Sequence, residues 1–328
     1  MSVFQALVIR KEDNLVQYEI EQIDLDQLSN GEVLIKVDYS SINYKDMLAI
    51  KQDGGVIRDY PMIPGIDLSG TIVATEGNTF KPGEEVIVTG FSLGMSHTGG
   101  FAEYARVPEE WIIARPNNLS LKDAMVFGTA GLTAGLSIQA LERQGMDPES
   151  NPSILVTGST GGVGSLALQI LRKAGYRNIT GMVRKEQQVE VAKNLGAHAV
   201  MFAKDMAQHP RPLEKQQFNY ILDTVGGAVA AALLPKIFYG GSMSMCGNAA
   251  GNSFSGTVLP FILRGISILG IDSVNVTLEE REQIWTKLAN QWNITSDALT
   301  QEISLQEVPS TIDALKSGQH LGRTIIKY

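Results

Sequence analysis

The chain has 328 residues, of which 44% are hydrophobic and 19% charged. This length suits two domains, and the composition is typical of a globular protein. The net charge of −8 argues against nucleic acid as the main partner. The single cysteine, Cys246, excludes both a disulfide within the chain and a cysteine-rich zinc site.

The amino-terminal segment lacks the long apolar core of a signal peptide, and no run of about 18 apolar residues occurs. We therefore expect a cytoplasmic protein without a membrane span.

Residues 5–9 and 32–37 alternate with the period of two of half-buried strands, and residues 69–73 and 85–89 are short β-rich runs. Gly and Pro turns separate these runs, which predicts a β-rich, barrel-like domain.

The pattern changes near residue 120. A helical stretch at 121–143 is interrupted by glycine at 128, 131 and 135. Short apolar strands then alternate with amphipathic helices, which predicts a parallel sheet covered by helices on both faces. The predicted strands are 153–157, 179–183, 199–202, 220–223, 241–245 and 267–271, and the clearest helices are 162–174 and 187–195.

The alternation of strands and helices ends in the last 35 residues. Residues 303–305 and 324–327 are predicted to be strands around a helix near 310–315, and we expect them to return to the first domain. The prediction is an α/β protein with a Rossmann-type doubly wound domain at 123–292. A β-rich catalytic domain is formed by 1–122 and 293–328.

A glycine-rich turn follows the strand 153–157 and opens the helix 162–174. Its glycines follow the pattern G-x-x-G-x-x-G, a departure from the usual G-x-G-x-x-G. Gly158 suits a tight turn, Gly161 a close approach to pyrophosphate, and Gly164 close packing of helix on strand. We predict that the backbone N–H groups of this turn bind a dinucleotide; the alternative is a glycine-rich turn without a ligand. The remaining predicted contacts in the turn are Ser159, Thr160, Gly162 and Val163.

The end of the next strand indicates which dinucleotide binds. NAD sites usually place a carboxylate there, whereas this chain has Arg184 and Lys185. A guanidinium binds a 2′-phosphate in a bidentate manner, so we predict NADPH as the cofactor. The alternative is that both side chains are solvated surface charges.

Several long motifs resemble the medium-chain dehydrogenase/reductase superfamily, in particular its quinone-oxidoreductase branch and the bacterial acrylyl-CoA reductase group. The resemblance covers essentially the whole chain and implies a GroES-like catalytic domain. In zinc-dependent relatives a cysteine stands at the place of Asn43, and Gly-His-Glu at the place of residues 65–67. Because amide, isoleucine and aspartate cannot recreate that ligand set, we expect no metal. The matching motifs are residues 41–46, 61–70, 99–104, 128–134, 259–265 and 322–324.

The resemblance also implies site residues. Asn43, Tyr44 and Asp46 lie in a stretch like the family's active-site loop. Tyr44 is predicted both as a proton or hydrogen-bond donor and as a substrate contact; a packing aromatic is the alternative. Arg264 is predicted to contact substrate, with an interface or loop arginine as the alternative. The further predicted cofactor contacts are Thr129, Thr133, Gly247 and Arg323.

A nicotinamide hydride without zinc suits conjugated acceptors. The resulting hypothesis is NADPH-dependent reduction of a short 2-enoyl-CoA such as acrylyl-CoA. An NADPH:quinone oxidoreductase or general alkene reductase is the alternative, and a cofactor-binding protein without turnover is a third. The resemblance further implies a homodimer that pairs through the strand 267–271.

Overall fold

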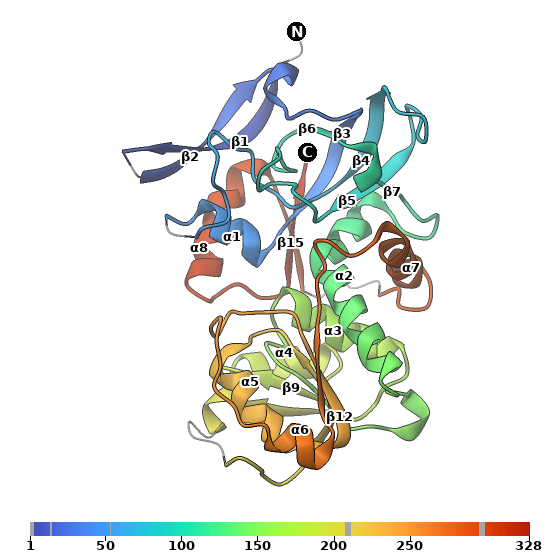
Figure 1. Ribbon diagram of the computed structural model, residues 1–328. Coiled ribbons are helices and arrows are strands. Elements are labelled where there is room, and N and C mark those ends of the chain that lie inside the picture. The colour runs from blue at the N-terminus through green and yellow to red at the C-terminus, as the bar shows by residue number, and fades with distance from the viewer. Residues whose placement is uncertain (1–2, 14, 53, 207–210, 295–298) are drawn as a thin grey trace. The chain divides into compact units, whose positions relative to one another are not determined.

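The computed structural model describes residues 3–13, 15–52, 54–206, 211–294 and 299–328. The chain folds into two compact units, each built around its own main sheet (Figure 1). The first unit comprises residues up to 129, residues 274–289 and residues from 295 onward; the second comprises 130–273 and 290–294. Residues 274–289 therefore group with the first unit, although they lie inside the span 123–292 predicted for the nucleotide-binding domain.

The first unit contains a hairpin and a seven-stranded sheet among the described residues. The sheet order is β14-β15-β3-β4-β5-β7, with β6 also paired to β3, and most neighbours are antiparallel. The predicted strands at 5–9, 32–37, 69–73 and 85–89 are confirmed as β1, β3, β4 and β5. The strands are β1 (Phe4–Glu12) and β2 (Leu15–Ile23) in the hairpin, then β3 (Val33–Ile42), β4 (Asp67–Thr75), β5 (Glu85–Thr89), β6 (Tyr104–Val107), β7 (Ile113–Ala114), β14 (Thr300–Ile303) and β15 (Arg323–Lys327).

The carboxyl-terminal segment returns to this sheet as predicted, because β15 pairs with β3. The predicted helix is confirmed as α8 (Val308–Lys316). The strand expected at 303–305 is wrong beyond residue 303, since a 3-10 turn, η6 (Leu305–Glu307), follows β14. The backbone N–H of Ser304 donates to the Glu307 carboxylate at 2.9 Å, and this capping box ends the strand.

The other helical segments of the first unit are short, apart from α7. They are α1 (Tyr44–Ile50) and α7 (Leu278–Ala289), with the 3-10 turns η1 (Leu25–Gln27) and η2 (Glu109–Trp111). Aliphatic side chains from both faces of β3 build two neighbouring cores; Ile42 lies in one, and Val33, Ile35 and Val37 lie in the other. The end of β3 is therefore held rigidly, which matters because the candidate site begins there.

The second unit is a six-stranded parallel sheet in the order β10-β9-β8-β11-β12-β13, which confirms the predicted Rossmann-type architecture. The chain order reverses between β8 and β11, and ligands of such sheets bind at this switch point. The strands are β8 (Ile154–Val156), β9 (Ile179–Val183), β10 (Ala199–Phe202), β11 (Phe218–Asp223), β12 (Ile237–Met245) and β13 (Ser267–Gly270). The helical segments are α3 (Gly162–Lys173), α4 (Gln188–Asn194), α5 (Gly227–Leu233), α6 (Leu259–Arg264), η3 (Pro148–Ser150), η4 (Ala203–Asp205) and η5 (Leu234–Lys236).

Helix α2 (Leu121–Arg143) carries the chain from the first unit into the second. Three glycines were expected to interrupt it, but only Gly128 leaves helical geometry, with φ 49° and ψ −155°. The expectation is wrong for Gly131 and Gly135, where the helix continues. By length and composition α2 could cross a membrane, yet 89% of its most apolar window is buried inside the protein. Burial of this kind is that of a core helix.

Candidate active site

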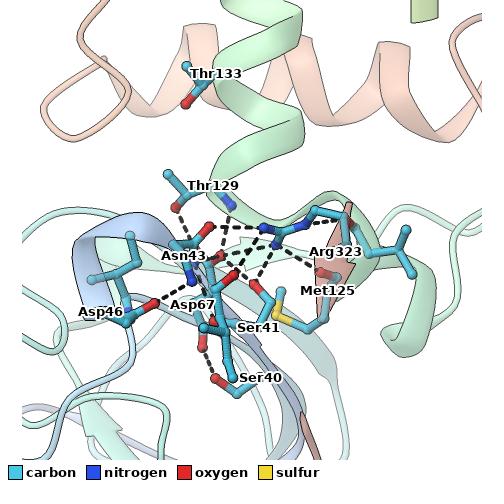
Figure 2. A network of polar contacts seen from close by, with 12 residues as sticks. Ser40, Ser41, Asn43, Asp46, Asp67, Met125, Thr129, Thr133 and Arg323 are labelled. Carbon is cyan, nitrogen blue, oxygen red and sulfur yellow. Dashed lines mark hydrogen bonds and ion pairs between the residues drawn. The ribbon is translucent and has the colours of Figure 1, made fainter. Parts of the chain in front are cut away.

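A buried polar cluster lies where β3 ends and α1 begins (Figure 2). Asn43 is the residue before α1, and its backbone N–H donates to Asp46 Oδ2 at 2.8 Å. This capping box sets the direction in which the chain enters the helix. Two of the three predicted catalytic side chains, Asn43 and Asp46, are thereby buried, whereas Tyr44 is 43% exposed.

Asp67, the first residue of β4, is the centre of the cluster and is fully buried. Its Oδ2 accepts hydrogen bonds from Ser41 Oγ at 2.6 Å and Asn43 Nδ2 at 2.8 Å. The backbone N–H of Thr129 donates to the same oxygen at 2.9 Å, and Thr129 Oγ1 donates to Oδ1 at 2.5 Å. Four donors thus replace the water that an ionised carboxylate loses on burial.

Arg323, the first residue of β15, packs its guanidinium into the same cluster and is also buried. Its Nη2 lies 4.0 Å from Asp67 Oδ2. A guanidinium has five N–H donors, and five acceptors surround this one. They are the carbonyl oxygens of Val126, Met125 and Ile42, Asn43 Oδ1 and Ser41 Oγ. The predicted cofactor contact of Arg323 stays a prediction, and the structure shows each of its N–H groups donating to an acceptor within the protein.

Asp46 is a second buried carboxyl in this region. Its Oδ1 accepts a hydrogen bond from the Ile66 backbone N–H at 3.1 Å. Burial, reinforced by the negative charge of Asp67, raises the pKa of Asp46 to about 7. The side chain closes the turn before α1 and has no exposed surface. This position suits a residue that supports Asn43 and Tyr44, not one that contacts substrate.

Gly128 allows the cluster to form. A Cβ on this residue would lie 2.4 Å from Asp67 Oδ2 and 2.6 Å from Ser41 Oγ. Its backbone conformation is also one that essentially only glycine adopts. The break leaves the N–H of Thr129 at the start of a new helical run, where Asp67 accepts it.

The cluster does not fit a zinc ion. At the positions that the resemblance assigns to the zinc-ligand motifs, this chain has Asn43, Ile66 and Asp67; isoleucine offers no ligand atom, and the other two side chains are hydrogen-bonded within the protein. A divalent cation at Asp67 Oδ2 would compete with the three hydrogen bonds to that oxygen and meet the Arg323 guanidinium 4.0 Å away. Among the described residues, no group of three or more His, Cys, Asp or Glu side chains is placed to hold a metal.

The glycine-rich turn of the second unit, residues 157–164, lies between β8 and α3 at the switch point of the sheet. Gly158 has φ +55°, and a Cβ on Gly164 would lie 2.2 Å from the Gly158 carbonyl oxygen. Gly161 precedes α3 and provides no side-chain cap, so the first N–H groups of the helix receive no capping hydrogen bond from this residue. The turn therefore fits the phosphates of a dinucleotide.

The other predicted cofactor residues divide into two groups. Arg184 and Lys185 are exposed at the end of β9, as a phosphate contact requires. By contrast, Ser159 Oγ donates to the Met182 carbonyl oxygen at 3.0 Å. This bond joins the turn to β9 and uses the hydroxyl proton of Ser159. Thr133 is buried and donates to Ser273 Oγ at 2.8 Å. The positions of Gly162 and Val163 in the first turn of α3 are compatible with their predicted role.

Two further predicted residues lie at opposite ends of the strands of the same sheet, Gly247 after the end of β12 and Arg264 near its start. Gly247 follows β12 and packs so tightly that a Cβ would lie 1.8 Å from the Thr224 carbonyl oxygen. Arg264, at the end of α6, donates to the carbonyl oxygens of Pro235 at 2.5 Å and Glu214 at 2.7 Å. The arrangement favours the alternative interpretation of Arg264, in which it fastens a loop, over a substrate contact.

Sequence reasoning missed two residues, one that supports each site. Ser41, which bonds both Asp67 and Arg323, was recognised only as part of a motif. Gln188, which bridges the glycine-rich turn and the basic strand end, carried no signal at all. Glutamine is found mostly on protein surfaces, so the sequence alone gives no sign that this one is buried and bridges two turns.

Comparisons with known proteins agree with this architecture. Residues 29–117 match the alcohol dehydrogenase GroES-like domain, and residues 162–290 match the zinc-binding dehydrogenase family. The acrylyl-CoA reductase AcuI of Ruegeria pomeroyi is 37% identical over 99% of each chain. The yhdH oxidoreductase of Salmonella enterica, solved in complex with NADP, is 40% identical over 99% of each chain, with a TM-score of 0.95. The Bacillus subtilis protein yhfP, solved with NAD bound, is 42% identical over the full length of both chains, also with a TM-score of 0.95.

A GroES-like unit joined to a six-stranded Rossmann sheet defines a class of two-domain oxidoreductases. The chain belongs to the medium-chain dehydrogenase/reductase superfamily, and it is similar over its full length to an acrylyl-CoA reductase.

The Gly128→Ala variant is expected to lose about 2–3 kcal/mol of unfolding free energy, because a methyl group would enter the Asp67 cluster from a strained backbone. Urea unfolding measures this. Gly256→Ala is the matched control, since a Cβ there meets nothing within 4 Å. A loss at Gly128 no larger than at Gly256 would contradict the packing described.

The raised pKa of Asp46 predicts a pH dependence of stability. Between the ordinary value of 3.8 and about 7, the folded protein holds a proton that the unfolded chain releases. The contribution is therefore complete below about pH 4 and is lost as the pH rises through 7, with a slope of up to about 1.4 kcal/mol per pH unit. Unfolding free energies measured from pH 5 to 8 should fall more steeply for the wild type than for Asp46→Asn.

Slopes are the quantity to compare here, because Asn also removes one acceptor of a backbone N–H group. Asp59→Asn, at an exposed carboxyl, serves as the control and should keep the wild-type slope. Parallel curves for the wild type and Asp46→Asn would show that Asp46 keeps an ordinary pKa in the folded protein.

Proposed function

We propose that the protein is an NADPH-dependent reductase of activated carbon–carbon double bonds, acting on a short 2-enoyl-CoA such as acrylyl-CoA. The observation that carries this proposal is the Asp67 carboxylate, which is satisfied by hydrogen bonds and a guanidinium at a place where the resemblance puts the zinc-ligand motif of zinc-dependent relatives. Full-length similarity to an acrylyl-CoA reductase supports the acceptor. NADP bound in a 40% identical structure supports the cofactor.

Bound NADPH supplies a hydride, and a conjugated thioester passes the resulting negative charge to its carbonyl oxygen. The protein must then offer a hydrogen-bond donor at that oxygen. Tyr44 is the predicted catalytic residue with an exposed side chain. Both N–H groups of the Asn43 amide are engaged, by Asp67 Oδ2 and by the Ser41 carbonyl oxygen at 3.3 Å. We therefore assign donation to Tyr44, and to Asn43 and Asp46 the role of holding it in place.

The cofactor preference rests on charge. Arg184 and Lys185 supply two cations at the strand end where NAD enzymes have a carboxylate. A 2′-phosphate carries the extra negative charge that two such cations favour. The NAD found with yhfP of Bacillus subtilis makes NADH the comparison that every cofactor measurement needs.

A quinone is the second candidate acceptor. The quinone-oxidoreductase QR1 of Triphysaria versicolor is 32% identical over 55% of this chain. A quinone accepts hydride by the same charge transfer to oxygen and also requires no metal. The two functions differ in whether the coenzyme A moiety contributes binding energy.

Purified protein with NADPH should consume acrylyl-CoA, with a kcat/KM at least about tenfold above that for a small quinone, because remote contacts to coenzyme A contribute to transition-state binding. Loss of absorbance at 340 nm measures both reactions. Tyr44→Phe should lower kcat by about 10²-fold or more if its hydroxyl donates to the developing oxyanion, whereas exposed Tyr239→Phe is the matched control. Absence of thioester-dependent oxidation of NADPH would reject the enoyl-CoA function.

We also propose that the protein is a homodimer. Strand β13 ends the parallel sheet, and the adjacent helix α6 exposes Ile262 and Leu263, which are 69% and 56% accessible. An apolar patch beside an unpaired strand edge suits pairing between identical chains. Size-exclusion chromatography with light scattering should give twice the 35.5 kDa chain mass, and Ile262→Glu should shift it toward one chain. Val73→Glu on β4 is the control, and a monomeric wild type would contradict the proposal.

A further inference from the structure

Gln188, at the start of α4, connects the two turns assigned to the cofactor. It is only 6% exposed. Its Oε1 accepts the backbone N–H groups of Arg184 at 2.9 Å and Lys185 at 3.0 Å. Its Nε2 donates to Thr160 Oγ1, in the glycine-rich turn, at 2.9 Å. One amide thus joins the turn predicted to hold the pyrophosphate to the turn predicted to hold the 2′-phosphate.

The chemistry of the partners fixes the orientation of this amide. Two backbone N–H groups can only donate, so the atom that faces them must be the oxygen. The amide nitrogen must then face Thr160, whose hydroxyl oxygen accepts. Because that oxygen accepts from Gln188, the hydroxyl proton of Thr160 is left to donate elsewhere, and the adjacent uncapped N–H groups of α3 mark the side where an anion binds.

The same contacts hold the basic turn in one shape. Besides the two side-chain bonds, the backbone N–H of Gln188 donates to the Lys185 carbonyl oxygen at 3.0 Å. The backbone of Arg184 and Lys185 is therefore anchored, while both side chains are exposed. Long cationic side chains lose binding energy to ordering, and a fixed backbone reduces that cost.

We propose that Gln188 is a positioning residue that sets the preference for NADPH over NADH, by fixing the basic turn relative to the pyrophosphate turn. The inference rests on the proposed cofactor. Loss of the Thr160 contact affects both dinucleotides, since both carry the pyrophosphate. Loss of the bonds to Arg184 and Lys185 affects only the dinucleotide with a 2′-phosphate. A larger effect on NADPH than on NADH is therefore the signature of this role.

The test measures dissociation constants of the full-length protein for NADPH and NADH by calorimetry. Gln188→Met keeps the side-chain length and removes all three hydrogen bonds. It should raise the Kd for NADPH by about tenfold and that for NADH by about twofold. The exposed neighbour Gln187→Met is the matched control and should leave both constants unchanged.

Gln188→Glu keeps the inference testable if Gln188→Met folds poorly, and Arg184→Ala extends the test. Gln188→Glu still accepts both backbone N–H groups and loses only the bond to Thr160, so it should weaken both dinucleotides and keep the NADPH-to-NADH ratio within about twofold of the wild type. Arg184→Ala removes the guanidinium directly. Adding Gln188→Met to Arg184→Ala should change the NADPH-to-NADH ratio by less than Gln188→Met does alone, because part of its effect acts through Arg184.

Equal loss of both cofactors in Gln188→Met, or a tenfold fall of the NADPH-to-NADH ratio in Gln188→Glu, would overturn the inference and leave the proposed function standing. Full additivity with Arg184→Ala would also overturn it. A wild-type protein that binds neither dinucleotide would instead reject the proposed function, and this inference with it.

Discussion

The burial of one negative charge organises the first unit. An ionised carboxylate removed from water is costly unless donors replace its hydration, and Asp67 receives four hydrogen bonds as well as a nearby guanidinium. These partners come from four parts of the fold: Ser41 at the end of β3, Asn43 before α1, Thr129 at the break in α2, which gives two of the hydrogen bonds, and Arg323 in the last strand. The carboxylate therefore ties together segments that the chain brings in separately.

The second unit has backbone donors without a partner from a capping side chain, where the first has a buried acceptor. There the free groups are backbone N–H donors at the start of α3, and Gly161 supplies no side chain to cap them. In α2 the equivalent donor at Thr129 is satisfied from within by Asp67. The helical run after Gly128 is therefore capped by the protein's own carboxylate, whereas the start of α3 can bind an anion from a ligand. This difference separates a structural cluster from a cofactor site, although both use the same partial charge at a helix terminus.

The chemistry proposed for the protein follows from what remains accessible. Asn43, Asp46, Asp67 and Arg323 use their polar atoms on one another, which makes them supports. Tyr44 is beside them in sequence but exposed, and its backbone is held by the capping box on both sides. A donor that is rigidly positioned costs little reorganisation when charge develops on an acceptor oxygen. A zinc-free hydride transfer to a conjugated acceptor requires such a donor.

Local patterns in the sequence were enough to determine the strands around the glycine-rich turn, the turn itself and the basic end of β9, because each depends on neighbours within a few residues. The break at Gly128 was also foreseen, but nothing local distinguished it from Gly131 and Gly135; only the Asp67 carboxylate packed against it does so. The place of Arg323 in the Asp67 cluster was not foreseen, because its partner Asn43 lies 280 residues away. The sequence by itself thus determined where helices, strands and an anion-binding turn form, while the tertiary structure decided which polar side chains face one another. Hydrogen bonding acts over about 3 Å in space and does not depend on separation along the chain.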